Sequence, residues 1–283
     1  MKKKILATAL CITVAVMTVL FSGCGSSSSV ASNTTTAQAD SPDATEAVES
    51  HEPVTILIAA AASLENAYVE ELIPMFEEKY DYITVEGTYD SSGKLQTQIE
   101  SGLEADVFMS AAQKQMNALV DESMIDSSTV INLLENKLVL IVPEGSDTDI
   151  TDFENITNAD IIAIGDPDSV PAGQYAKEAF TNLGIWDDVA AKASLGTNVT
   201  EVLSWVEAAS ADAGVVYATD AASSDKVKVI SEAPEGSLET PVIYPVGIIS
   251  GTAHSEEAQL FVDFLQTDEA LAVFEAYGFT INN

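Results

Sequence analysis

The stretch that decides the fold is "VTILIAAAASLENAYVEELIPMFEEKYDYITVEGTYDSSGKLQTQIESGLEADVFMSA", residues 54–111. Three apolar runs in it predict strands, at 54–62, 83–89 and 105–111. The two segments between them, 64–80 and 93–101, predict helices, because apolar residues recur there at helical spacing. Strands that alternate with helices in this way are typical of a parallel sheet in an α/β protein.

The same alternation continues to the end of the chain. Further strands are predicted at 137–143, 160–167, 213–221, 227–232 and 244–250. Further helices are predicted at 116–136, 173–185, 198–211 and, as a pair, 254–279. We expect lobe 1 to comprise residues 53–137 and 245–283, and lobe 2 residues 138–244. Two connections between the lobes would form a hinge around a central cleft.

The N-terminus predicts export from the cytoplasm. Lysines are followed by an apolar run that is short for a membrane span of about 20 residues, so residues 1–23 are predicted to be a signal peptide. The sequence "LFSGC" resembles the lipobox of bacterial lipoproteins, which implies a lipid on Cys24 and an extracytoplasmic protein anchored to the cell membrane. Cleavage and release without a lipid is the alternative. Residues 24–52, rich in Ser, Thr and Ala, predict a flexible tether.

The composition excludes several classes of function. The net charge is −34, and nucleic acids are poor partners because they need a basic surface. All 11 basic residues are lysines, so the bidentate arginine clamp for carboxylate or phosphate is absent. Cys11 would leave with the signal peptide, which leaves no disulfide. His51 and His254 lack ligand-like spacing, so we expect no cofactor and no direct metal ligands.

Five short motifs place donor groups where strands end and helices begin. "AAASL" contains Ser63, and "DSSGKL" contains Ser91 and Ser92. Helix capping explains each serine taken singly. A set of helix N-termini, however, also favours a bound anion. The other three positions are Ala172, Val199 and Tyr217. Ala172 lies in "VPAG", and Val199 directly follows Asn198, which forms a capping pair with Glu201. Tyr217 lies at the end of an apolar strand.

Together these motifs, in order and spacing, resemble the periplasmic molybdate-binding proteins of ABC transporters. "ADVFMSA", "YPVGII" and "YGF" share the resemblance, which covers residues 54–279. It implies a periplasmic-binding-protein-like fold of type II, with two lobes, each a mostly parallel sheet flanked by helices, and a ligand cleft between them. It implies a membrane permease as partner, and we expect a monomer. The oxyanion donors that it implies are Ser63, Ser92, Ala172, Val199 and Tyr217.

One motif departs from the family pattern. The family often has three serines in a row where this chain has Ser91, Ser92 and Gly93, so a role for Ser91 beside Ser92 stays open.

A site made of neutral donors also predicts selectivity against phosphate, because the proton of phosphate would stay unpaired at a cost of about 1–3 kcal/mol. Molybdate, tungstate and sulfate carry no such proton. The resemblance favours molybdate, with tungstate equally acceptable.

Three other functions compete with this interpretation. The same scaffold could bind sulfate or a small organic anion. An enzyme is disfavoured, because the chain has no G-x-S-x-G motif, no phosphate loop and no histidine base near a serine. A structural or adhesive surface lipoprotein is compatible with the tether alone. The convergent helix openings and the absence of sequence repeats favour a binding protein over it.

Overall fold

The computed structural model describes residues 51–282. The predicted signal peptide, Cys24 and the tether up to residue 50 lie outside the described residues. Among residues 51–282, no helix combines the length and the apolar character needed to cross a bilayer.

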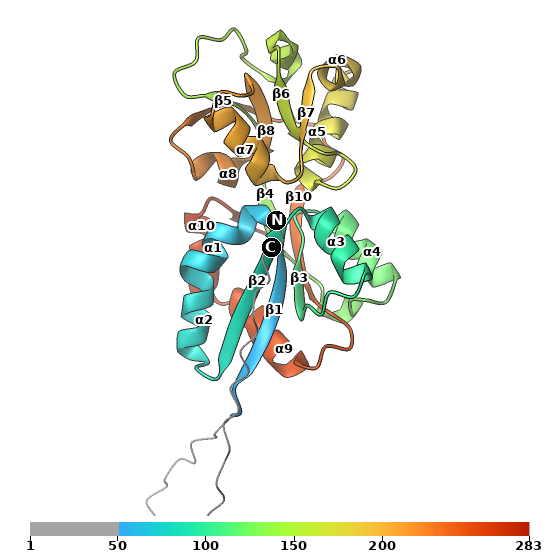
Figure 1. Ribbon diagram of the computed structural model, residues 1–283, viewed down its shortest axis with the longest axis vertical. Helices are drawn as coiled ribbons and strands as arrows, with labels where there is room; N and C mark the ends of the chain where they lie inside the picture. The colour runs from blue at the N-terminus through green and yellow to red at the C-terminus, as the bar shows by residue number, and fades with distance from the viewer. Residues whose placement is uncertain (1–50, 283) are drawn as a thin grey trace, which may run out of the picture. The chain divides into compact units, whose positions relative to one another are not determined.

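The start and the end of the described chain form a six-stranded sheet (Figure 1). Its strand order is β11-β4-β10-β3-β1-β2. β1 pairs in parallel with β2 and β3, whereas β10 is antiparallel to β3 and β4. The strands are β1 (Val54–Ala61), β2 (Ile83–Asp90), β3 (Val107–Met109), β4 (Ile131–Asn136), β10 (Val242–Ile248) and β11 (Thr280–Ile281).

The middle of the chain forms a five-stranded sheet with the order β7-β6-β8-β5-β9. β6 pairs in parallel with β7 and β8, and β5 is antiparallel to β8 and β9. The strands are β5 (Leu138–Pro143), β6 (Ile162–Gly165), β7 (Ala193–Gly196), β8 (Ala213–Tyr217) and β9 (Val227–Glu232). Below, lobe 1 and lobe 2 denote the six-stranded and five-stranded sheets with their helices.

Helices flank both sheets (Figure 1). Those of lobe 1 are η1 (Ala62–Leu64), α1 (Glu65–Ala67), η2 (Tyr68–Leu72), α2 (Ile73–Lys79), α3 (Ser92–Glu100), α4 (Gln113–Asp121), η3 (Ser127–Thr129), α9 (Ser255–Leu265) and α10 (Asp268–Ala276). Those of lobe 2 are η4 (Phe153–Asn158), α5 (Pro171–Asn182), α6 (Trp186–Ala190), α7 (Val199–Glu207) and α8 (Ala218–Ala222).

The first helical segment follows directly from the sequence pattern. Leu64, Tyr68, Leu72 and Phe76 recur at every fourth position and are all fully buried. Residues four apart lie on one face of a helix, so this row forms the face that packs against the sheet. Phe76 meets Phe261 of α9 edge to face, with 5.0 Å between the ring centroids. This packing orients the start of the segment, η1, at the end of β1.

The chain crosses between the sheets at two places. β4 and β5 belong to different sheets, yet Lys137 alone separates them. The return path, residues 233–241, joins β9 to β10. Near the first crossing, Asn136 Nδ2 donates to Thr219 Oγ1 at 2.9 Å and to Tyr244 Oη at 3.3 Å. Both crossings therefore run beside one buried polar cluster.

The structure confirms the predicted two-lobed α/β fold and corrects several details. Both sheets are mixed rather than mostly parallel, because the strands next to each crossing run antiparallel to their neighbours. Residues 242–244, which we assigned to lobe 2, pair with β4 in the six-stranded sheet. The predicted strand 213–221 ends at Tyr217, where α8 begins.

The prediction of a helix up to residue 136 is wrong, since residues 131–136 form β4. Pairing with β10 on one side and β11 on the other overrides the local pattern. Leu133 and Leu134 are both buried, so β4 lacks the alternation by which we recognise strands. The elements α6 and β7 were not predicted either. α6 spans only five residues, and β7 contains a single large apolar residue, Leu195, which is 50% exposed.

Candidate functional site

One small cavity brings together all five residues that the sequence predicted. It encloses about 200 Å³ of empty space, open solvent at its mouth included. Its lining residues are Ala61, Ala62, Ser63, Asp90, Ser91, Ser92 and Ala111 from lobe 1, and Val170, Pro171, Ala172, Val199 and Tyr217 from lobe 2. The role of the five as oxyanion donors stays a prediction, although the fold now places them on one surface.

Parallel strand pairing positions the serines of lobe 1. Ala61 at the end of β1 is in register with Asp90 at the end of β2. Because parallel strands end at the same edge of a sheet, the residues that follow lie side by side. These residues are Ser63 in η1 and Ser91 and Ser92 at the start of α3.

Two helix openings supply the backbone donors of lobe 2. Ala172 lies in the first turn of α5, which begins at Pro171. Val199 is the first residue of α7, and Asn198 caps that helix by accepting from the Glu201 N–H at 2.9 Å. N–H groups in a first turn have no partner inside the helix and carry the positive end of its dipole. Ala172 and Val199 are thus suited to an anion.

Close packing holds α5 against its strand. A Cβ atom on Gly173 would lie 2.0 Å from the carbonyl oxygen of Gly165 in β6. Only glycine permits this approach between helix and strand backbone. The glycine of "VPAG" therefore allows the start of α5, which carries Ala172, to lie close against β6.

The three serine hydroxyls of the cavity differ in their partners. Ser63 Oγ lies 2.9 Å from Tyr244 Oη. Ser92 Oγ accepts from the Ala111 N–H at 2.9 Å, which leaves its own hydrogen available to a ligand. Ser91 Oγ is buried and has no hydrogen-bond partner among the described residues. A buried hydroxyl without a partner costs free energy, so Ser91 is placed to donate to a bound group.

Burial keeps the cavity tyrosines protonated. It raises the pKa of Tyr217 and of Tyr244 well above the usual value for tyrosine. Both side chains are therefore hydroxyl donors near neutral pH. Tyr217 Oη makes a long contact of 3.5 Å with the carbonyl oxygen of Ala111, and it also interacts with the hydroxyl of Tyr244. Tyr244, which supports Ser63, was missed because nothing in "YPVGII" marks the tyrosine as polar.

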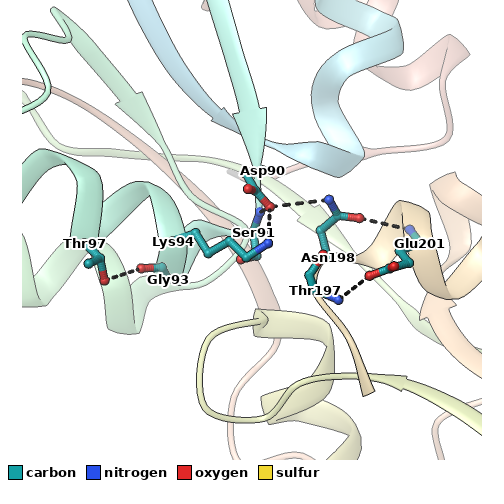
Figure 2. Close-up of polar contacts among 8 residues, drawn as sticks. All are labelled: Asp90, Ser91, Gly93, Lys94, Thr97, Thr197, Asn198 and Glu201. Atoms are coloured by element: carbon teal, nitrogen blue, oxygen red, sulfur yellow. Dashed lines mark hydrogen bonds and ion pairs between the residues drawn. The ribbon is translucent and has the colours of Figure 1, made fainter. Parts of the chain in front are cut away.

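Asp90 is a charged lining residue that the sequence analysis missed, and Figure 2 shows its contacts. Its Oδ1 atom accepts from the Ser91 N–H at 2.7 Å, from Lys94 Nζ at 3.2 Å and from Asn198 Nδ2 at 3.4 Å. The cavity wall is thus not made of neutral donors alone. These donors offset the negative charge of the Asp90 carboxylate where it faces the other lobe. An acidic residue directly before "SSGK" was the available signal.

The arrangement is suited to binding rather than to catalysis. Donor groups converge from the starts of α3, α5 and α7 and from two strand ends. Within residues 51–282, no group of three or more His, Cys, Asp or Glu residues is placed to hold a metal ion. Neutral donors at helix N-termini stabilise a compact anion without direct coordination of its central atom.

Comparisons with known proteins agree with this geometry. Residues 56–280 match the family described as "Bacterial extracellular solute-binding protein". "Putative ABC transporter substrate-binding lipoprotein YvgL" of Bacillus subtilis is 45% identical over 232 residues, which are 82% of this chain and 88% of that one. "Molybdate-binding protein ModA" of Escherichia coli is 40% identical over 80% of this chain and 89% of its own.

A solved structure extends the match to three dimensions. The "substrate binding domain of putative molybdenum ABC transporter" from Clostridium difficile is 35% identical and superposes with a TM-score of 0.63. The alignment covers 81% of this chain and 100% of that one. The family match spans both sheets and every residue of the cavity. The chain therefore belongs to the family of bacterial extracellular solute-binding proteins.

Proposed function

We propose that this protein captures molybdate outside the cytoplasm and delivers it to the permease of an ABC importer. One observation carries the proposal: five donors predicted from separate motifs line a single small cavity between two sheets. The name of the 40% identical relative, a molybdate-binding protein, supports the choice of anion. Tungstate is proposed as a second ligand, because it is a tetrahedral dianion of the same charge.

The proposed donors are the hydroxyls of Ser63, Ser92 and Tyr217 and the backbone N–H groups of Ala172 and Val199. We add Ser91, because its hydroxyl is buried in the cavity wall and lacks a protein partner. The alternatives on this scaffold are sulfate and a small organic anion. The latter is disfavoured, because a carboxylate ligand usually pairs with arginine and this chain has none.

The rest of the proposal concerns the setting of this site. The lobes close over the ligand by rotation about the two crossings, with residues 242–244 now assigned to lobe 1. A lipid on Cys24 anchors the protein, which acts as a monomer and meets the permease at the membrane. One observation supports the anchor: the 45% identical relative is named a lipoprotein.

Calorimetric titration of residues 25–283 tests the ligand. Molybdate, tungstate, sulfate and phosphate are titrated separately at one salt concentration. We expect tight binding of molybdate and tungstate, weak binding of sulfate and none of phosphate, because Asp90 Oδ1 in the cavity wall already accepts from three donors and the proposed ligand groups serve as donors. Tighter binding of sulfate than of molybdate would overturn the choice of anion. No detectable binding of any of the four anions would overturn the oxyanion-binding function itself.

A further inference from the structure

We infer that Asp90 and Gly93 form a latch that holds the two lobes closed, with Asp90 as a positioning residue for the Val199 N–H. The inference rests on the proposed function, because it concerns how the same cavity retains its anion. The latch is the segment of residues 90–93, which runs from the last residue of β2 to the second residue of α3 in lobe 1. Each end of this segment makes a hydrogen bond to a different helix opening of lobe 2.

The first contact of the latch is made by the Asp90 carboxylate. Asn198 Nδ2, from lobe 2, donates to Asp90 Oδ1 across the cleft at 3.4 Å (Figure 2). The Ser91 N–H and Lys94 Nζ donate to the same oxygen from within lobe 1. These local donors fix the orientation of Asp90, whose side chain is 25% exposed. The carboxylate is thereby held ready for the amide of the other lobe.

Asn198 links this contact to the predicted ligand site. Its Oδ1 accepts from the Glu201 N–H at 2.9 Å and so caps α7, while its Nδ2 faces Asp90. Val199, the next residue, lines the cavity, and its N–H is one of the proposed donors. One amide side chain therefore couples the start of α7 to the end of β2, and Asp90 sets the place of Val199 through Asn198.

The second contact of the latch is made by backbone atoms. The Gly93 N–H donates to the carbonyl oxygen of Ser169 at 3.0 Å, just before α5 in lobe 2. A Cβ atom on residue 93 would lie 2.3 Å from that oxygen. Gly93 is therefore needed for this approach, although it lies outside the positive-φ glycines of the described chain. This close approach is a structural reason for glycine at position 93, where the family often has a third serine.

Both contacts join residues of different lobes, so they form only when the lobes are closed. A contact that is lost on opening stabilises the closed state and slows release of the ligand, with little effect on the encounter rate. Opening also leaves Asp90 with fewer donors beside the emptying cavity. Its negative charge then opposes rebinding of a dianion.

A double-mutant cycle tests the Asp90–Asn198 contact. Asp90→Ala removes the acceptor, and Asn198→Ser removes the cross-lobe donor while keeping a good helix cap. Stopped-flow displacement of molybdate measures the dissociation rate for residues 25–283. We expect each variant to release molybdate about three- to tenfold faster, and the double variant no faster than the faster single variant. Effects that multiply would show that the two residues act separately, and would overturn the latch.

Two further variants separate the latch from general damage. Gly93→Ala should also speed release, because its methyl group pushes Ser169 away, while the melting temperature of the ligand-free protein stays close to that of the wild type. Asp121→Ala removes an exposed carboxylate from α4 and should leave the rate unchanged. An unchanged rate in Gly93→Ala would overturn the backbone half of the latch.

A distance measurement keeps the latch testable if the wild type binds no oxyanion. Residues 25–283 contain no cysteine, so Gln98→Cys in α3 and Asp188→Cys in α6 provide unique sites for spin labels. Pulsed electron paramagnetic resonance then gives the distances between the lobes. We expect Asp90→Ala to shift the distribution toward longer distances. Identical distributions with and without Asp90 would overturn the latch, whereas failure of the four titrations would overturn only the proposed function.

Discussion

At the scale of single residues, the sequence indicated where the donors lie along the chain but not which groups they contact. Ser63, Ser92 and Tyr217 stand where strands end, and the resemblance to the molybdate-binding proteins singled them out as donors. The structure adds that Ser92 Oγ already accepts from a backbone N–H, whereas Ser91 Oγ has no partner in the described chain. Such differences arise from contacts between distant segments. No local pattern encodes them.

Ser91 and Ser92 are therefore expected to respond differently to substitution. Ser91→Ala removes a buried hydroxyl without a partner, so it should raise the free energy of unfolding of the ligand-free protein while weakening molybdate binding about tenfold. Ser92→Ala, its matched control, leaves the Ala111 N–H without an acceptor and should lower the free energy of unfolding by about 1–3 kcal/mol. Urea unfolding and calorimetry measure both quantities. Equal destabilisation by the two variants would contradict this difference.

Asp220 predicts a specific pH dependence of stability. Burial raises the pKa of its carboxyl group to about 7, although the Tyr217 N–H donates to it at 3.1 Å. Because the folded state holds this proton more tightly than the unfolded state, Asp220 makes the protein less stable as pH rises from about 4 to 7. Asp220→Asn should flatten the profile in that range. Urea unfolding at several pH values checks this, and parallel profiles of variant and wild type would contradict it.

At the scale of elements, segments with a clear period or an apolar run were predictable, and segments with neither were not. The helical segment from η1 to α2 has a buried residue at every fourth position, so its pattern is plain. β4 shows no such pattern, because two adjacent leucines are buried there and neighbouring strands cover both of its edges. The cavity, in contrast, could be anticipated, because the motifs at the ends of these elements together resemble those of the molybdate-binding proteins.

The packing of α5 on β6 gives a prediction at this scale. Gly173→Ala places a methyl group against the carbonyl oxygen of Gly165 and should displace the start of α5. We expect the free energy of unfolding to fall by about 1–3 kcal/mol and molybdate affinity to fall with it, because the Ala172 N–H moves. Thermal unfolding and calorimetry measure the two effects. Thr181→Ala, on the exposed side of the same helix, serves as the control, and equal behaviour of both variants would count against this role of Gly173.

At the scale of the whole molecule, the charge opposes the ligand that the site favours. The chain carries a formal net charge of −34, while the cavity offers mainly neutral donors and helix N-termini. Long-range repulsion and local attraction act over different distances. At physiological ionic strength, charges farther apart than about 8 Å are largely screened. The local donors therefore dominate affinity.

The association rate should consequently rise as the salt concentration rises, whereas attraction between opposite charges would make it fall. Raising sodium chloride from about 10 to 150 mM screens the repulsion and should accelerate molybdate association. The dissociation rate should change less, because the closed cavity excludes most of the salt. Stopped-flow measurements at several salt concentrations check both rates. Association that slows with added salt would indicate a local positive field around the mouth of the cavity.

The crossing at Lys137 constrains how proteins of this architecture vary over evolution. Only one residue separates β4 from β5. An insertion there would lengthen the hinge connection between the two sheets and would shift one sheet relative to the other. The return path of residues 233–241 has slack to absorb extra residues. We therefore expect related genes to gain and lose codons in the return path and in surface loops, while the spacing between β4 and β5 stays constant.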